Sequence, residues 1–115
     1  MTNDYKWIFP AGGVQVLGID DSGAVAVKVV LDLGFGFYRT LKAQLAMVRI
    51  NESPDHRTIA KDFIQEWSVA RQAQGVLRCE TQRLIASNDW VAHLYSGKKR
   101  ESVAAALVEQ GLGRI

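Results

Sequence analysis

The chain reads GAVAVKVVL over residues 23–31, DLGFGFY over residues 32–38 and RTLKAQLAMVRIN over residues 39–51, and this stretch decides the fold. The first segment is dominated by β-branched residues and predicts a strand that is buried on most of its surface. Apolar side chains then recur at every second position from Leu41 to Met47, which predicts a second long strand over residues 38–50. Strands of this length coil and serve two sheets, as in a small barrel. The glycines on both sides of Phe35 favour a sharp turn in which this ring tucks under the barrel.

The bulk composition indicates a single globular domain over residues 1–115, with an N-terminal leader at residues 1–13. The chain is 48% hydrophobic and 23% charged, which suits one domain with one core. Cys79 is the only cysteine, so an internal disulfide is excluded and a reducing compartment is favoured. We expect Cys79 and Trp90 in the core. No apolar run is long enough to span a bilayer, and the N-terminus lacks the order of a signal peptide, so a cytoplasmic protein without a membrane partner is expected.

Turn and cap signals divide the rest of the chain into further elements. A strand over residues 14–19 precedes the turn Asp20-Asp21-Ser22-Gly23, and Ser53 and Pro54 open a helix predicted over residues 54–74. Strands are expected over residues 76–81 and 90–95, and a short helix capped by Ser102 ends at Gly111. The order β-β-β-α-β-β-α predicts a mainly β protein with two helices, built as a five-stranded OB-type barrel. The open face of such barrels often holds oligonucleotides.

Three short motifs occur in this order along the chain. They are Asp32-Leu33-Gly34-Phe35-Gly36, Trp90-Val91-Ala92 and Ala106-Leu107-Val108-Glu109-Gln110-Gly111-Leu112. Together they resemble the loop between the second and third strands, the start of the fifth strand and the final helix of the staphylococcal-nuclease-like (thermonuclease) domains, in particular the compact phage and bacterial members. The resemblance covers roughly Val14 to Gly113 and implies the same five-stranded barrel.

The resemblance also implies where catalytic residues would lie. Active members of this family carry an Asp-Gly-Asp-Thr hairpin, an arginine on the third strand, an Asp-x-Pro-Glu turn and an arginine before the fifth strand, and their acids hold calcium. Counted without a gap, this chain has Gln44 at the first arginine, Arg49 at the metal-binding aspartate, Glu52 at the glutamate of the turn and Asp89 at the second arginine. A one-residue shift puts Asn88 in place of Asp89, and neither residue supplies the missing charge.

A second register remains open, in which Asn51 and Asp55 take the two acidic positions of the turn. It needs an insertion and still supplies neither arginine. Because both registers lack the two arginines, and Arg49 would also repel calcium in the ungapped one, both predict a degenerate catalytic site. Loss of one donor that stabilises the transition state already costs about 10²–10³ in rate.

No cofactor is therefore expected, and calcium only if the chain is a nuclease after all, with Asp20, Asp21 and Glu52 as the fallback ligands. We also expect the guanidinium of Arg49 to fill the place of the metal, paired with Glu52 or with the two hairpin acids, since acids gathered at one point repel one another unless a cation lies among them.

The basic residues point to a binding role. The net charge is +2 and the pI about 8.9, which is compatible with nucleic acid. The candidate phosphate contacts are Arg39, Lys42 and the run Lys98-Lys99-Arg100. The leading hypothesis is a phage-derived binding module of nuclease ancestry whose partner is nucleic acid or a protein. The alternatives are a weak metal-dependent endonuclease or phosphodiesterase, and a protein-binding inhibitor of a host or nucleic-acid-processing factor.

Overall fold

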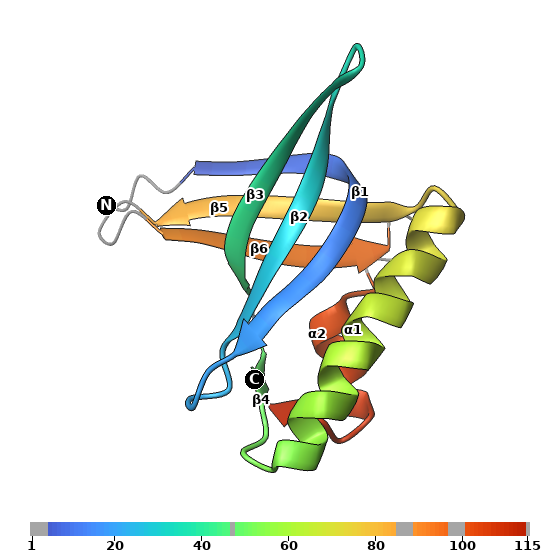
Figure 1. Cartoon of the computed structure of the whole chain (residues 1–115). Helices are drawn as coiled ribbons and strands as arrows, with labels where there is room; N and C mark the ends of the chain where they lie inside the picture. Colours follow the sequence, from blue (N-terminus) through green and yellow to red (C-terminus); the bar gives the residue numbers. More distant parts are fainter. Residues whose placement is uncertain (1–4, 47, 85–88, 97–100, 115) are drawn as a thin grey trace.

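Five strands close into a barrel in the order β1-β2-β3-β6-β5 (Figure 1). The computed structural model describes residues 5–46, 48–84, 89–96 and 101–114. The barrel strands are β1 (Tyr5–Ile19), β2 (Val25–Gly34), β3 (Phe37–Leu45), β5 (Leu77–Leu84) and β6 (Asp89–Ser96). The helices are α1 (Pro54–Ala73) and α2 (Val103–Glu109), and the short strands β4 (Arg49–Ile50) and β7 (Gly113–Arg114) form a separate two-stranded sheet. The predicted class, a mainly β chain with two helices and a closed five-stranded barrel in the order β-β-β-α-β-β-α, is confirmed.

The barrel interior follows from alternation along its strands. On β2, Val25, Val27, Val29 and Leu31 are all buried, while the residues between them are more exposed. Leu41, Ala43 and Leu45 continue this inner face on β3. Since successive side chains of a strand point to opposite faces, one run of β-branched residues is sufficient to fill one wall of the barrel.

β1 is long enough to pair with one strand along each of its two halves. Its second half, from Ala11 to Ile19, pairs with β2, and its first half, from Tyr5 to Pro10, pairs with β5. The register shifts between Ala11 and Gly13, so the two glycines form a bulge at which the strand bends. The expected leader is therefore wrong from Tyr5 onward, because residues 5–13 belong to the first strand.

The third strand is shorter than predicted. It ends at Leu45, where β3 meets β6 in parallel, and the chain then leaves the barrel to form β4 against β7. Val48 and Ile50 are buried there, although they no longer belong to the third strand.

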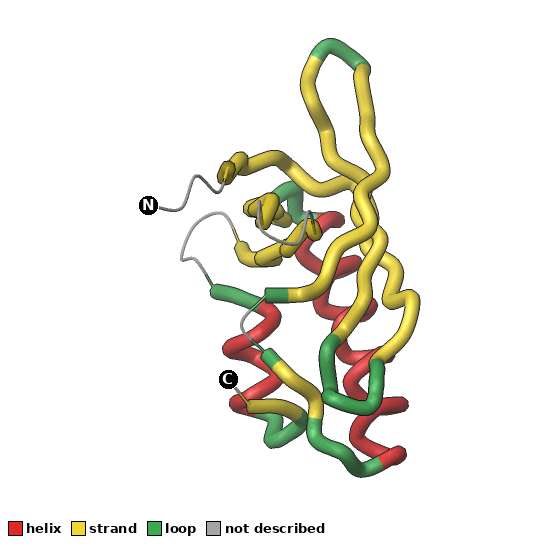
Figure 2. Tube along the Cα trace, turned by 90° about the vertical axis from the view of Figure 1, so that its left-hand side faces the viewer, coloured by secondary structure: helices red, strands yellow, loops and turns green. Residues whose placement is uncertain are grey.

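The turn between β2 and β3 also differs from the prediction. β2 and β3 stay paired as far as Gly34 and Phe37, and this hairpin rises beyond the barrel (Figures 1 and 2). Phe35 lies at its tip with a relative exposure of 101%, so the ring does not tuck under the barrel.

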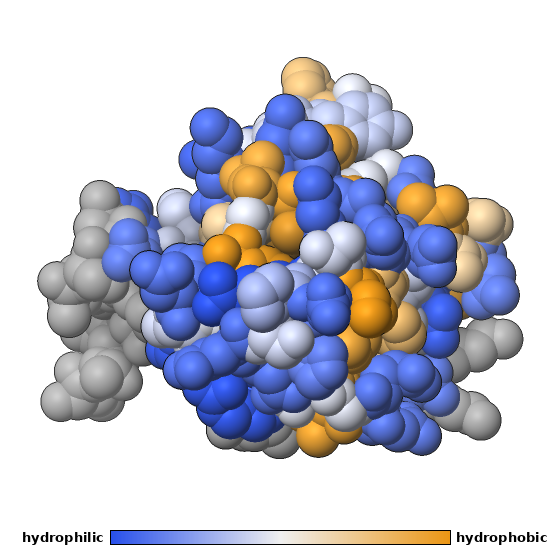
Figure 3. All heavy atoms as spheres, turned by 60° about the horizontal axis from the view of Figure 1, so that its bottom comes forward, coloured by the Kyte–Doolittle hydropathy of each residue, from blue (hydrophilic) through white to orange (hydrophobic). Residues whose placement is uncertain are grey.

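Both helices lie toward the end of the barrel away from this tip (Figures 1 and 2). The predicted helix over residues 54–74 is confirmed as α1, and Ser102 caps α2 by accepting a hydrogen bond from the Ala105 N–H at 3.0 Å. Seen from below, most of the surface is hydrophilic and the apolar side chains form separate patches (Figure 3). None of the described helices is long and apolar enough to cross a membrane.

Candidate nucleic-acid interface

The turn between β1 and β2 is organised by one carboxylate. Asp20 Oδ1 accepts hydrogen bonds from the Ser22 N–H at 2.9 Å, the Ser22 hydroxyl at 2.6 Å and the Ala24 N–H at 3.0 Å. The hydroxyl of Ser22, followed by the N–H of Ala24, holds the pKa of Asp20 below its ordinary value. Asp20 therefore serves as a turn-forming acceptor, which is the usual role of aspartate in such a turn.

Two arginines reach this turn from other elements. Arg49 on β4 donates from NH1 to the Ser22 hydroxyl at 2.9 Å, and its charge adds to the lowering of the Asp20 pKa. Arg57 on α1 lies 3.9 Å from the Asp21 carboxylate and donates to the Asp21 carbonyl at 3.3 Å. We call Asp20, Asp21, Ser22, Arg49 and Arg57 the acidic corner.

The expected pairing of Arg49 with an acid is thus partly met. Arg49 does come to the hairpin, but it donates its hydrogen bond to the Ser22 hydroxyl, which in turn donates to Asp20. Arg57 was missed by the sequence reasoning, because nothing in a helical first turn signals which distant loop it will meet. The ion pair that Arg57 forms is weak support for the turn, since the side chain of Asp21 is fully exposed to solvent.

The fallback metal ligands do not assemble. Among the residues that the structure describes, which include Asp20, Asp21 and Glu52, no group of three or more potential His, Cys, Asp or Glu ligands could hold a metal ion. Glu52 is exposed in the bend between β4 and α1.

The other family positions divide between two places. Gln44 borders one cleft together with Asp20 and a second cleft together with Arg49, so the ungapped register does bring these three residues to one end of the barrel. Asp89 opens β6 opposite Leu84 and belongs to neither cleft. The acidic corner therefore lies beside the neutral Gln44, and its Arg49 is already bonded to the turn.

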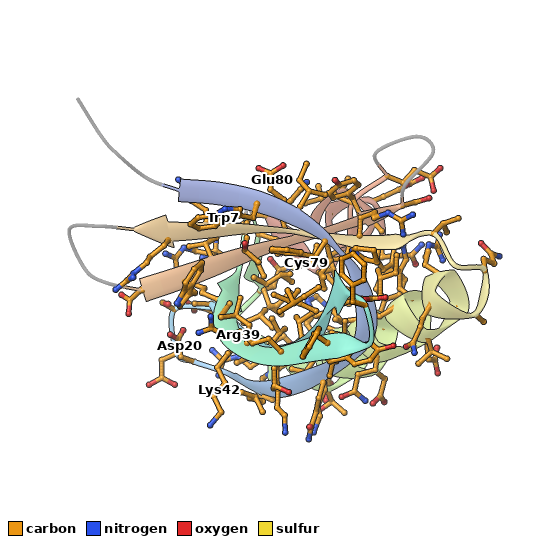
Figure 4. All side chains as sticks on the ribbon, turned by 90° about the horizontal axis from the view of Figure 1, so that it is seen from above. Trp7, Asp20, Arg39, Lys42, Cys79 and Glu80 are labelled. Carbon is orange, nitrogen blue, oxygen red and sulfur yellow. The ribbon has the colours of Figure 1, made fainter. Side chains whose placement is uncertain are left out.

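The predicted phosphate contacts are not one patch. Arg39 and Lys42 lie on opposite faces of β3, with Arg39 directed into the barrel opening and Lys42 directed outward (Figure 4). Lys42 stands across from Lys28 of β2 on the outer face, and two like charges in register repel each other. Lys98, Lys99 and Arg100 lie outside the described residues.

A pocket of about 200 Å³ opens at the end of the barrel beside the base of the β2–β3 hairpin. We call it the barrel mouth. It is lined by Trp7, Phe9, Leu31, Leu33, Arg39, Leu41, Thr81 and Trp90, which come from all five strands. Apart from Arg39 and Thr81 the lining is apolar, and Thr81 is buried with its hydroxyl donating to the Trp7 carbonyl at 3.3 Å.

Two tryptophans from opposite ends of the chain meet at the mouth. The ring centres of Trp7 and Trp90 are 6.0 Å apart and the rings are tilted by 46°. The guanidinium carbon of Arg83 lies 5.9 Å from the centre of the Trp90 ring, within cation–π range. Trp90 packs against the core as expected but remains half-buried, and Trp7 keeps 42% of its surface exposed. Aromatic faces and cations are thereby combined at one opening.

Cys79 takes no part in either site. It is fully buried, and burial raises the pKa of its thiol to about 12, so the thiol stays neutral and unreactive. The prediction of a small core residue is confirmed.

Searches against protein-family models, curated proteins and solved structures found no match for the chain. The resemblance to the thermonuclease family therefore stays a prediction that is carried by the three motifs alone.

Proposed function

We propose that this chain is a binding module of nuclease ancestry that captures single-stranded nucleic acid at the barrel mouth. The observation that carries the proposal is the pair Trp7 and Trp90, which lies beside Arg39 in one pocket with Arg83 over the Trp90 ring. Proteins that bind single strands without reading sequence combine stacking aromatic rings with cations that follow the phosphates, and each stacked base contributes about 1–3 kcal/mol.

The form of the pocket favours a single strand over a duplex. The bases of a duplex present only their edges in the grooves, so their faces cannot stack on a protein ring. A mostly apolar pocket of about 200 Å³ suits an unpaired base whose phosphate remains outside near Arg39. Aromatic stacking accepts every base, so we expect little sequence preference.

The acidic corner supports binding without cleavage. Gln44 cannot supply the positive charge that a phosphoryl transition state needs, and Arg49 places a cation among the acids of the turn. The chemistry of these residues suits a stable turn better than hydrolysis.

Fluorescence anisotropy with a labelled oligothymidine tests the proposal. We expect binding at 50 mM salt, a loss of about tenfold for Trp7→Leu because one stacking face is removed, and a smaller loss for the matched control Trp7→Phe, which keeps a ring. Absence of binding at low salt, or equal affinity of Trp7→Leu and the wild-type chain, would refute this function. Turnover of the oligonucleotide in calcium that is lost in Glu52→Gln would instead support the nuclease alternative.

A further inference from the structure

Residues 32–38 form a free-standing two-stranded ribbon above the barrel mouth, and we refer to them as the ribbon (Figures 1 and 2). The pairing of β1 with β2 stops at Leu31, and β3 pairs with β6 only at Gln44 and Leu45. Within the described parts of these strands, both outer edges of the ribbon are therefore unpaired. Such edges present N–H and C=O groups that can accept another strand.

The tip of the ribbon is apolar on every side. Phe35 is 101% exposed, Phe37 68%, Tyr38 63% and Leu33 44%, and no charged residue occurs between Leu33 and Tyr38. Phe37 and Tyr38 lie on opposite faces of the ribbon because successive residues of a strand alternate. A single flat ligand could cover only one of these faces. Burial of all of them requires a pocket that encloses the tip.

The backbone holds Phe35 in this outward position. Gly34, Phe35 and Gly36 have φ values of 88°, 56° and 78°, and a bulky residue with positive φ is an outlier. Asp32 fixes the start of the turn by accepting a hydrogen bond from the Gly34 N–H at 2.9 Å. The exposed ring is therefore presented by a defined turn.

The chain itself carries a pocket of matching character at the base of the same ribbon. The barrel mouth is about 200 Å³ in volume and mostly apolar, and Leu31 and Leu33 belong to both the mouth and the strand that continues into the ribbon. Leu33 still lines the mouth and Phe35 follows two positions later, so the tip stands roughly 7 Å beyond the mouth. It cannot fold back over so short a distance, but it can reach the mouth of another molecule.

We propose that two copies of this chain dimerise by exchanging ribbons, so that the Phe35 tip of each copy enters the barrel mouth of the other. In a dimer with a two-fold axis, the contact between a Phe35 tip and a barrel mouth occurs twice. The same axis places the unpaired edges of the two ribbons side by side and antiparallel. The inference rests on the proposed function in one respect, since the dimer would close the mouth to nucleic acid. Dimer formation would then regulate that site by competition.

Sedimentation velocity of the full chain between 1 and 200 µM tests the proposal. We expect a concentration-dependent dimer whose dissociation constant rises at least about 100-fold in Phe35→Asn, because two buried rings are lost per dimer. Asparagine tolerates positive φ, so the turn is preserved. Ile59→Ser is the matched control, since Ile59 is 52% exposed on α1, whose first half lies at the opposite end of the molecule (Figure 1).

A monomer at every concentration, or a dimer that Phe35→Asn leaves unchanged, would overturn the exchange. Binding of the monomer to phosphatidylcholine–phosphatidylglycerol vesicles through Phe35 would overturn it too, with a bilayer as the true occupant. Added oligothymidine should dissociate the dimer. If the dimer forms but oligothymidine does not bind, the proposed function is refuted and the ribbon exchange is supported. If oligothymidine binds to a protein that is monomeric at every concentration, the ribbon exchange is refuted and the proposed function is supported.

Discussion

Replacement of Gly23, the residue that follows Ser22 of the acidic corner, by alanine should strongly destabilise the protein. Gly23 has a φ of 86° and its carbonyl accepts a hydrogen bond from the Ile50 N–H at 2.8 Å. A Cβ atom at this position would lie 2.3 Å from the Ile50 carbonyl oxygen and 2.9 Å from the Ile50 nitrogen. Since both atoms belong to the backbone, the conflict can be relieved only by moving the turn away from β4.

The magnitude follows from three contributions. A residue with a Cβ costs about 1–2 kcal/mol in the left-handed region. Loss of the hydrogen bond between Gly23 and Ile50 costs about 0.5–1.5 kcal/mol. Ile50 is completely buried, so its displacement adds a packing cost. We therefore expect the free energy of unfolding to fall by about 3 kcal/mol or more, in the upper part of the range for single substitutions.

Urea and thermal unfolding, followed by tryptophan fluorescence, would measure this loss. At roughly 4 °C per kcal/mol for a domain of this size, the melting temperature should fall by about 12 °C. Gly18→Ala is the control, because a Cβ at Gly18 meets nothing within 4 Å and the substitution only restricts the unfolded chain. Stabilities of the two variants that agree within about 1 kcal/mol would refute the reasoning.

Three further predictions concern charges and the thiol. Arg49→Ala should lower the free energy of unfolding by only about 0.5–1.5 kcal/mol, because Arg49 is exposed and the substitution removes one hydrogen bond. Calcium should not raise the melting temperature of the wild-type protein or of the variant. A larger loss of stability, or stabilisation by calcium, would contradict this role of Arg49. Arg39→Gln should reduce the slope of log K against log salt for a single strand by about 0.7, whereas Lys42→Gln on the opposite face should leave it unchanged. Cys79 should resist Ellman's reagent at pH 8 until urea is added. Because the pKa of the buried thiol is raised, its contribution to the free energy of unfolding is fully present below the ordinary pKa of 9.0. This contribution should be lost as the pH rises from 9.0 toward 12. Unfolding measured at several pH values would show the loss.

Local signals predicted the elements of this fold well. The alternating Val25, Val27 and Val29 identified a barrel wall, and Pro54 and Gly111 marked where helical segments begin and end. These signals are reliable because strand propensity, helix caps and the alternation of apolar and polar residues each depend on only a few neighbouring residues. The first half of β1 was missed because two adjacent glycines fit both a chain break and a bulge, and only the pairing with β5 distinguishes them.

The candidate site was predictable only in part. The ungapped register brought Gln44, Arg49 and the acidic turn together, but it gave no sign that Arg57 would reach Asp21. The meeting of Trp7 with Trp90 is equally invisible in the sequence, since it depends on closure of the barrel by strands from both ends of the chain. Phe35 was placed wrongly because a glycine-flanked aromatic residue is compatible with burial or with an exposed tip.

The pairing of β1 with two different strands has a consequence for folding during synthesis on the ribosome. Its second half can pair with β2 as soon as that strand emerges, but its first half must wait for β5, and the Thr81–Trp7 hydrogen bond spans 74 residues. At about 5–20 residues per second, this delay lasts roughly 4–15 s. During that time the segment Trp7-Ile8-Phe9 stays exposed on a growing chain, where it is a natural target for a chaperone. The barrel mouth comes into existence only after Trp90 has emerged, so a shorter nascent chain cannot capture a ligand there.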